Sequence, residues 1–313
     1  MPRFKKGLTI AIVTRKRPER LERCLRSVVK QKKKARFVLL IDNDSERSAY
    51  EVYKKFKEEI KGLRYECVKT QGIPQVRNRA LECCETEFLA YVDDDCVLSE
   101  NWIKSALNGI SKYKEVAYVV GQSLLLNKKS IVARSMYHIY RCWFFVSVDV
   151  KSLRLSGRSL DTKNIVFRMK YFKKFRLFFD TLFNVNPVGG GEDVDMGLKL
   201  NELNLVGFYI PKMRLWHEEP SSVCQLVKKA YYRGISTFLL YDKWNLEKNI
   251  VNLKDLNIFK WFYNIRLWGK DYRKIGGGMW EKLRILILIK LFDRLHLQGF
   301  VDGRKKFSCK ELN

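Results

Sequence analysis

The sequence predicts an α/β protein in which helices flank a mainly parallel sheet, followed by a helical C-terminal extension. Short apolar runs alternate with helical patterns over the first 100 residues. Polar residues come directly after three of these runs. From Leu246 onward the chain is rich in Trp, Tyr, Lys and Arg and has a helical pattern.

The first half of the predicted sheet begins with Leu8–Thr14, a run of apolar and β-branched residues. Leucines and valines at helical spacing follow over Pro18–Val29. Phe37–Ile41 predicts a second buried strand that ends at Asp42, and Tyr50–Ile60 has a helical pattern. The order is therefore strand, helix, strand, helix.

A strand expected at Arg64–Lys69 continues this alternation, and Gly72 and Pro74 then break the chain. The elements expected after the break are a helix at Gln75–Cys84, a strand at Phe88–Val92, a helix at Asn101–Lys112 and a strand at Val116–Val120. The stretch from 122 to 160 is less regular. Strands that alternate with helices predict a parallel sheet.

Composition favours a folded protein that binds something negative. Apolar types make up 46% of the 313 residues and aromatics 13%, which excludes the usual disordered class. The net charge of +27 suits nucleic acid, an anionic membrane or a phosphorylated substrate. The eight cysteines lack disulfide or zinc spacing, and neither a signal peptide nor a conventional transmembrane run is recognisable, so we expect a cytoplasmic protein.

Thr14, Asp42 and Asp93 each stand at the end of a predicted strand. Ligands of such sheets bind beyond the carboxyl ends of the strands, where helix N-termini begin. Packing alone would not explain polar residues at all three positions, because it would place apolar residues there as readily as polar ones. We therefore expect these three residues to lie in a ligand site.

The run Asp93-Asp94-Asp95 follows an apolar strand. In extended backbone Asp93 and Asp95 point to the same side. Two such carboxylates, together with substrate phosphate oxygens, form a site for Mg²⁺ or Mn²⁺. The alternative is an acidic turn that caps the helix expected at Asn101.

A second acidic motif, GGGEDVD at residues 189–195, precedes a helical pattern. Glycines let a ligand approach the backbone, and acids suit the first turn of a helix. We interpret this motif as carrying a general base, with a plain helix cap as the alternative. His217 is either structural or a metal ligand. Four arginines adjoin the predicted ligand loops and could pair with phosphates: Arg15, Arg17, Arg77 and Arg79.

The ordered motifs resemble the family 2 glycosyltransferases, which have the GT-A fold, a mixed and mainly parallel Rossmann-like sheet. The resemblance covers roughly residues 8 to 220. The matching segments are TRKRPERLERCLRSV, LLIDND, GIPQVRNRAL, YVDDD, DTKNIVFRM, GGGEDVDMGLKL and LWHEE. The stretch from 122 to 160 and the C-terminal tail match nothing in the family by eye.

The resemblance implies a role for each matching residue. Asp93, Asp95 and His217 would hold the metal. Asp193 would be the catalytic base, with Glu192 beside it. The residues expected to contact the donor are Thr14, Arg15 and Asp42 at the nucleoside, Arg77 at the diphosphate, Thr162 and Asn164 at the sugar, and also Asp93, Asp94, Gly190 and Gly191.

The implied reaction moves a sugar from a UDP-, GDP- or dTDP-sugar to a glycan or lipid-linked acceptor hydroxyl, with inversion and with Mn²⁺ or Mg²⁺. We expect a catalytic domain over 1–245, with a nucleotide-binding half at 1–100 and an acceptor half at 101–245. The alternatives are a nucleotidyltransferase and a basic nucleic-acid-binding protein. Carboxylates at the strand ends argue against nucleic acid.

The extension over 246–313 carries 15 Lys plus Arg against 7 Asp plus Glu, a net charge of +8. Trp261, Trp268 and Trp280 lie among these charges. We predict that this extension docks on an anionic membrane at its cytoplasmic face. Its apolar residues at four-residue spacing, Leu283, Ile287, Leu291 and Leu295, could instead pack on the catalytic domain or on a second subunit.

Overall fold

The structure is a computed structural model that describes residues 4–70, 72–144, 153–155, 160–185, 190–246 and 277–307. The described residues fall into two compact units. The sheet unit comes from residues within 1–126, 146–184 and 192–218, and the helical unit from residues within 127–145, 185–191 and 219–313. The predicted division at residue 245 stays a prediction.

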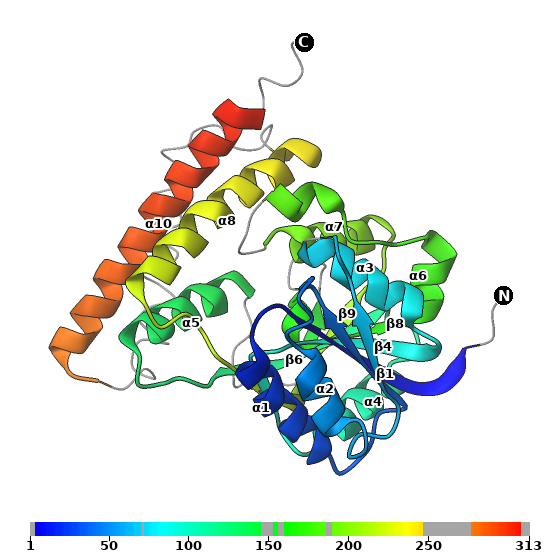
Figure 1. The fold of residues 1–313 in the computed structure, drawn as a ribbon. Helices are drawn as coiled ribbons and strands as arrows, with labels where there is room; N and C mark the ends of the chain where they lie inside the picture. Colours follow the sequence, from blue (N-terminus) through cyan, green and yellow to red (C-terminus); the bar gives the residue numbers. More distant parts are fainter. Residues whose placement is uncertain are drawn as a thin grey trace. The chain divides into compact units, whose positions relative to one another are not determined.

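The sheet unit contains nine strands among its described residues, in the order β3-β2-β1-β4-β8-β6-β9-β5, with β7 paired to β9 (Figure 1). Their bounds are β1 (Lys5–Thr14), β2 (Phe37–Asp42), β3 (Leu63–Cys67), β4 (Thr86–Asp93), β5 (Cys96–Leu98), β6 (Tyr118–Leu125), β7 (Leu153–Leu155), β8 (Ile165–Arg168) and β9 (Gly207–His217). The four longest pairings, β1 with β2 and β4, β2 with β3, and β6 with β9, are parallel. The shorter pairings of β8, β5 and β7 are antiparallel. The predicted mixed, mainly parallel sheet is confirmed.

Helices cover both faces of this sheet, because alternate residues of each central strand point to opposite sides. Ile10 and Ile12 pack toward α1 (Pro18–Val29), α2 (Tyr50–Phe56) and α4 (Trp102–Lys112). Ala11 packs on the other face toward α3 (Ile73–Cys83), α6 (Met169–Phe175) and α7 (Glu192–Glu202). Burial on both faces explains why these strands are continuous apolar runs. The short 3-10 turns η2 (Thr162–Asn164) and η3 (Thr181–Val185) complete the unit.

The helical unit consists, in its described residues, of α5 (Ile131–Phe144), α8 (Val223–Lys243) and α10 (Met279–Phe307). Ser222 caps α8 by accepting from the amide of Gln225, which completes a capping box. Glycines bring α8 and α10 into backbone contact, since a Cβ on Gly299 would lie 1.9 Å from the carbonyl oxygen of Tyr231. No described helix is both long and apolar enough to cross a membrane.

The face of α10 that packs on α5 and α8 agrees only in part with the stripe chosen from the sequence. Ile285, Ile289 and Phe292 are buried in the core of the helical unit. Of the predicted stripe, Leu291 and Leu295 are partly buried against this core, whereas Leu283 and Ile287 are 44% and 57% exposed. Four-residue spacing occurs on both sides of this helix, so the spacing alone could not tell which side packs. Trp261 and Trp268 lie outside the described residues.

Candidate active site

The carboxyl ends of β1, β2 and β4 meet at one edge of the sheet. In the parallel register Thr14 pairs with Asp42, and Val13 pairs with Asp93. The hydroxyl of Thr14 donates to Asp94 Oδ2 at 2.7 Å. The three strand ends predicted to line a ligand site are therefore neighbours.

Asp93, Asp94 and Asp95 differ in exposure. The side chain of Asp93 is 36% exposed, whereas Asp94 and Asp95 are buried. Burial raises the pKa of Asp94, and Asp95 raises it further, against the opposing charge of Arg17. Burial also raises the pKa of Asp93, while Arg77 lowers it. This cluster concentrates negative charge that requires a cationic partner.

His217 ends β9 and brings an imidazole to this cluster. Its pairing opposite Cys96 of β5 places Nε2 3.2 Å from Asp95 Oδ1. The next amide, that of Glu218, donates to the carbonyl of Asp95 at 3.1 Å. One ligand atom from each of Asp93, Asp95 and His217 lies within 4.8 Å of the other two. Two carboxylates and one imidazole at this separation are a suitable donor set for a divalent cation.

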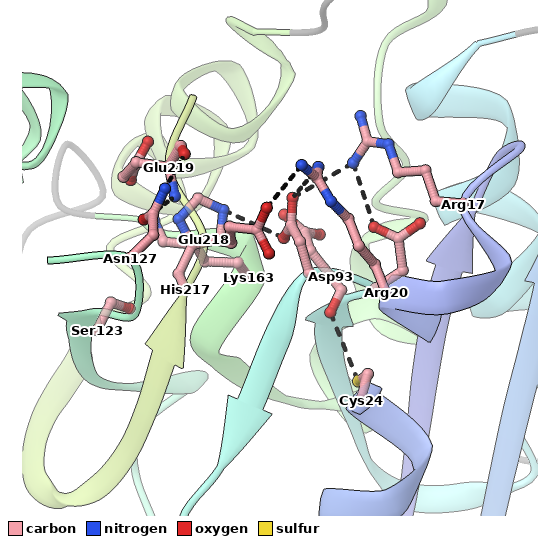
Figure 2. A network of polar contacts seen from close by, with 12 residues as sticks. Arg17, Arg20, Cys24, Asp93, Ser123, Asn127, Lys163, His217, Glu218 and Glu219 are labelled. Atoms are coloured by element: carbon pink, nitrogen blue, oxygen red, sulfur yellow. Dashed lines mark hydrogen bonds and ion pairs between the residues drawn. The ribbon is translucent and has the colours of Figure 1, made fainter. Parts of the chain in front are cut away.

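Two arginines at the start of α1, Arg17 and Arg20, reach these aspartates, and both are labelled in Figure 2. Arg17 Nη1 lies 3.2 Å from Asp94 Oδ1 and 3.3 Å from Asp95 Oδ2. Arg20 lies 2.7 Å from Glu218 and 3.9 Å from Asp95, and Arg23 also pairs with Glu218. The sequence analysis included Arg17 but missed Arg20 and Arg23. Their three-residue spacing, which places them on one side of α1, was the available signal.

A buried ion pair links α3 to α7. Arg77, whose side chain is 7% exposed, bonds Glu192 and lies 3.9 Å from Asp93. Burial lowers the pKa of Arg77, but the negative charges of Glu192, Asp93 and Asp193 raise it by more, so the net shift is upward. Glu192 therefore fixes a guanidinium beside the acidic cluster.

The remaining acids of α7 have different surroundings. Asp195 is buried and its carboxylate lies 2.9 Å from Lys199. Asp193 is only partly buried, and its Oδ1 accepts the amide of Val194 at 2.8 Å. Before the helix, Gly190 and Gly191 have φ of +130° and +95°, which explains the glycines at these positions. Of the three acids in this motif, Asp193 is the most accessible to a ligand.

The segment from 161 to 164 contributes a lysine that the sequence analysis missed. Lys163 Nζ lies 2.7 Å from Asp161, and its charge lowers the pKa of Asp93. Thr162 is buried beside it. Asn164 is fully buried, accepts from the indole of Trp102 at 2.8 Å and donates to the carbonyl of Met213 at 3.3 Å. Its amide thus supports the sheet under this site.

At the far end of the edge, Asp42 is fully buried and organises the loop that follows it. Its carboxylate accepts from the amides of Asp44 and Ala49 and from the hydroxyl of Tyr65. Burial raises the pKa of Asp42, against the effect of these hydrogen bonds. Arg15 is exposed, whereas Arg79 pairs with Glu66 and Glu82 on the surface.

Comparisons with known proteins identify the family and the fold. The family described as Glycosyl transferase family 2 matches residues 9–176. An alignment over 244 residues, which covers 68% of this chain, is 25% identical to hyaluronan synthase of Pasteurella multocida. The aligned part is only 25% of the length of that synthase.

Two solved structures have a similar fold. One is TarS 1–349 of S. aureus in complex with UDP-GlcNAc, with a TM-score of 0.54, 12% identity, and 96% of this chain and 91% of that chain covered. The other is the mannosyltransferase PcManGT from Pyrobaculum calidifontis in complex with GDP-Man and Mn²⁺, with a TM-score of 0.55, 13% identity, and 98% and 76% covered. The fold is that of the GT-A glycosyltransferases. Since the family match covers more than half of the chain, this protein belongs to glycosyl transferase family 2.

Proposed function

We propose that this protein transfers a sugar from a nucleotide-diphosphate sugar to an acceptor hydroxyl and inverts the anomeric centre. The bound donors of the two structural neighbours, UDP-GlcNAc and GDP-Man, support a nucleotide-sugar donor. We propose a glycan or lipid-linked acceptor. Family membership favours glycosyl transfer over the two alternatives, nucleotidyl transfer and nucleic-acid binding.

Asp93, Asp95 and His217 would hold a divalent cation, and the Mn²⁺ of the mannosyltransferase complex supports this proposal. Carboxylates suit Mg²⁺ and Mn²⁺ alike, but imidazole suits the transition metals better, so the donor set favours Mn²⁺. When bound, the cation would neutralise charge on the departing diphosphate. Asp93 ends β4, His217 ends β9, and Asp95 lies in the turn between β4 and β5, so the sheet holds all three in place.

Arg77, Lys163 and Arg17 would supply further positive charge for the diphosphate. Arg77 and Lys163 are largely buried, with side chains 7% and 13% exposed. In such a position a cation interacts more strongly with phosphate than it would in water. Arg17, which is half-exposed, could exchange Asp94 and Asp95 for a phosphate oxygen when the donor binds.

The proposal that Asp193 is the catalytic base depends on how the three acids at the start of α7 differ in their partners and exposure. Glu192 is committed to Arg77, and Asp195 is buried against Lys199. Asp193 is more accessible than either, in the first turn of a helix that also carries the link to Arg77. We propose that Asp193 takes the proton of the attacking hydroxyl, and that Glu192 acts by holding Arg77 in place.

The other residues predicted to contact the donor fall into two groups: some would touch it, and others would act by positioning the residues that do. Thr14, Arg15, Gly190 and Gly191 would touch the donor directly. Asp94 and Asp42 would act by positioning Arg17 and the loop after β2, because their carboxylates already bond the protein. Thr162 and Asn164 would support the sugar subsite from beneath, since both are buried.

A donor panel tests the proposal. The protein is incubated with UDP-, GDP- and dTDP-sugars, with Mn²⁺ or with a chelator, and release of the nucleoside diphosphate is measured. We expect release from one donor class, dependent on the metal. NMR of the product then reports the anomeric configuration. Retention of configuration would exclude the direct displacement, and a rate indifferent to the chelator would remove the metal from the mechanism.

A further inference from the structure

The first turns of α10 expose a cluster of large apolar side chains. Among the described residues nine large apolar side chains are exposed, and four of them lie between 279 and 287. They are Met279, Trp280, Leu283 and Ile287, with exposed fractions of 76%, 72%, 44% and 57%. Single exposed apolar residues are ordinary, but a cluster of this kind marks an interaction site.

These side chains form a face of their own and are not the edge of the packed face. At about 100° per residue, Trp280, Leu283 and Ile287 point to the same side of the helix. The buried residues Ile285 and Ile289 lie on the opposite side. The exposed cluster is therefore a second apolar face, which the packing of α10 on α5 and α8 leaves open.

Basic residues flank this second face. Arg284, Lys290 and Arg294 are exposed and lie within about 60° of its centre at Ile287. The acids of the same stretch lie elsewhere, and Glu281 pairs with Arg134 of α5. No described acid forms an ion pair with the three basic residues. We name this surface, from Trp280 to Arg294, the basic apolar face.

We propose that the basic apolar face docks the protein on an anionic lipid surface, with α10 lying in the plane of the interface. Trp280 would sit at the level of the headgroups, Leu283 and Ile287 would insert, and the three basic residues would attract anionic lipid. The finding that no described helix is suited to span a membrane agrees with a helix that lies on it.

The chemistry of the basic apolar face argues against two other partners, a second copy of the chain and a nucleic acid. A symmetric contact with a second copy would set the basic residues of one face against those of the other. A nucleic acid would use the cations, but it offers nothing apolar to receive Leu283 and Ile287. Docking on lipid goes beyond the proposed function and does not depend on the donor chemistry.

Flotation of the full chain with vesicles tests the proposal. We expect binding to vesicles that contain phosphatidylglycerol, weak binding to pure phosphatidylcholine, and release when salt is raised. The triple variant Arg284→Gln/Lys290→Gln/Arg294→Gln should lower the partition coefficient on the order of 100-fold, and Trp280→Ser/Ile287→Ser should lower it at least 10-fold. Both variants change exposed side chains, and thermal unfolding verifies that they fold.

The matched control is Lys32→Gln/Lys33→Gln/Lys34→Gln, which removes the same charge from three exposed lysines of the sheet unit. It should bind vesicles nearly as well as the unchanged protein. An equal loss in this control would mean that general positive charge explains the binding, and full binding by Trp280→Ser/Ile287→Ser would exclude insertion. If light scattering instead showed a dimer that this double variant dissociates, the face would be a subunit contact. Each of these results would overturn the proposal.

Discussion

The two acidic motifs of the sheet unit have similar sequences and different surroundings. The carboxylates of Asp93 and Asp95 converge with His217, and Arg17 and Arg20 at the start of α1 contact Asp94 and Asp95. In the second motif Arg77 binds Glu192 and Lys199 binds Asp195, whereas Asp193 is the more accessible.

This difference shows that the partners of an acidic residue, rather than its position in a motif, indicate whether it is suited to bind a metal or to transfer a proton. Convergent carboxylates repel one another, so they need a cation between them. In the second motif Glu192 and Asp195 each pair with a cation of the protein. Asp193 is more accessible than these two, so it would be the better placed to accept a proton from a ligand.

The largest expected effect comes from Asp193→Asn. The amide has the same shape but cannot accept the acceptor proton, so turnover should fall by about 10²- to 10⁴-fold. Donor affinity should be unchanged, because the diphosphate would be held elsewhere. Nucleotide release under saturating donor and acceptor, with calorimetry of donor binding, checks both parts. Near-normal turnover would assign the base to another residue.

Asp95→Ala should have the next largest effect and tests the convergent motif. Loss of residues that merely support a metal ligand weakens metal binding by about 10- to 100-fold, so loss of a ligand should reach at least the upper end of this range. Mn²⁺ affinity can be measured by calorimetry without any donor. The fold should remain, since the side chain lies at a strand end and not in the apolar core. Unchanged Mn²⁺ affinity would place the metal elsewhere.

Arg20→Gln should have a smaller effect on the same site. Arg20 joins Asp95, in the turn after β4, to Glu218, the residue after the end of β9. Without this link the two strand ends are held less firmly, and we expect Mn²⁺ to bind about 10-fold more weakly. Arg26→Gln is the matched control, because Arg26 lies on the same helix and pairs with Glu22 on the surface. Equal Mn²⁺ affinity in the two variants would leave Arg20 with a role in folding alone.

Much of the sheet could be predicted from the sequence, because buried central strands are continuous apolar runs. Leu8–Thr14 and Phe88–Val92 lie within β1 and β4. The positions of Asp42 and Asp93 at strand ends were also predictable from where the runs stop. The antiparallel strand β8 was not foreseen from the pattern of residues, since only pairing between distant segments gives a strand its direction.

Contacts between distant residues could not be predicted. Arg23 and Glu218 are 195 residues apart, and no local spacing links them. Asn164 was expected at the sugar, but its environment depends on Trp102 and Met213, which belong to other elements. For α10 the helix was predictable, whereas the side that packs was not, because both sides carry apolar residues.

The smallest effect on activity should come from Lys199→Met, which tests whether Asp195 of α7 has a structural role alone. Lys199 offsets the cost of burying Asp195, whose carboxylate lies 2.9 Å from its amine. Removing that cation from a fully buried carboxylate should lower the free energy of unfolding by about 1–3 kcal/mol. Turnover per folded molecule should not change, because Asp195 would not touch the substrate. Denaturant unfolding together with nucleotide release at low temperature separates the two readouts. A large loss of turnover with normal stability would mean that Asp195 and Lys199 belong to the chemistry, and the division among the acids of α7 would then be wrong.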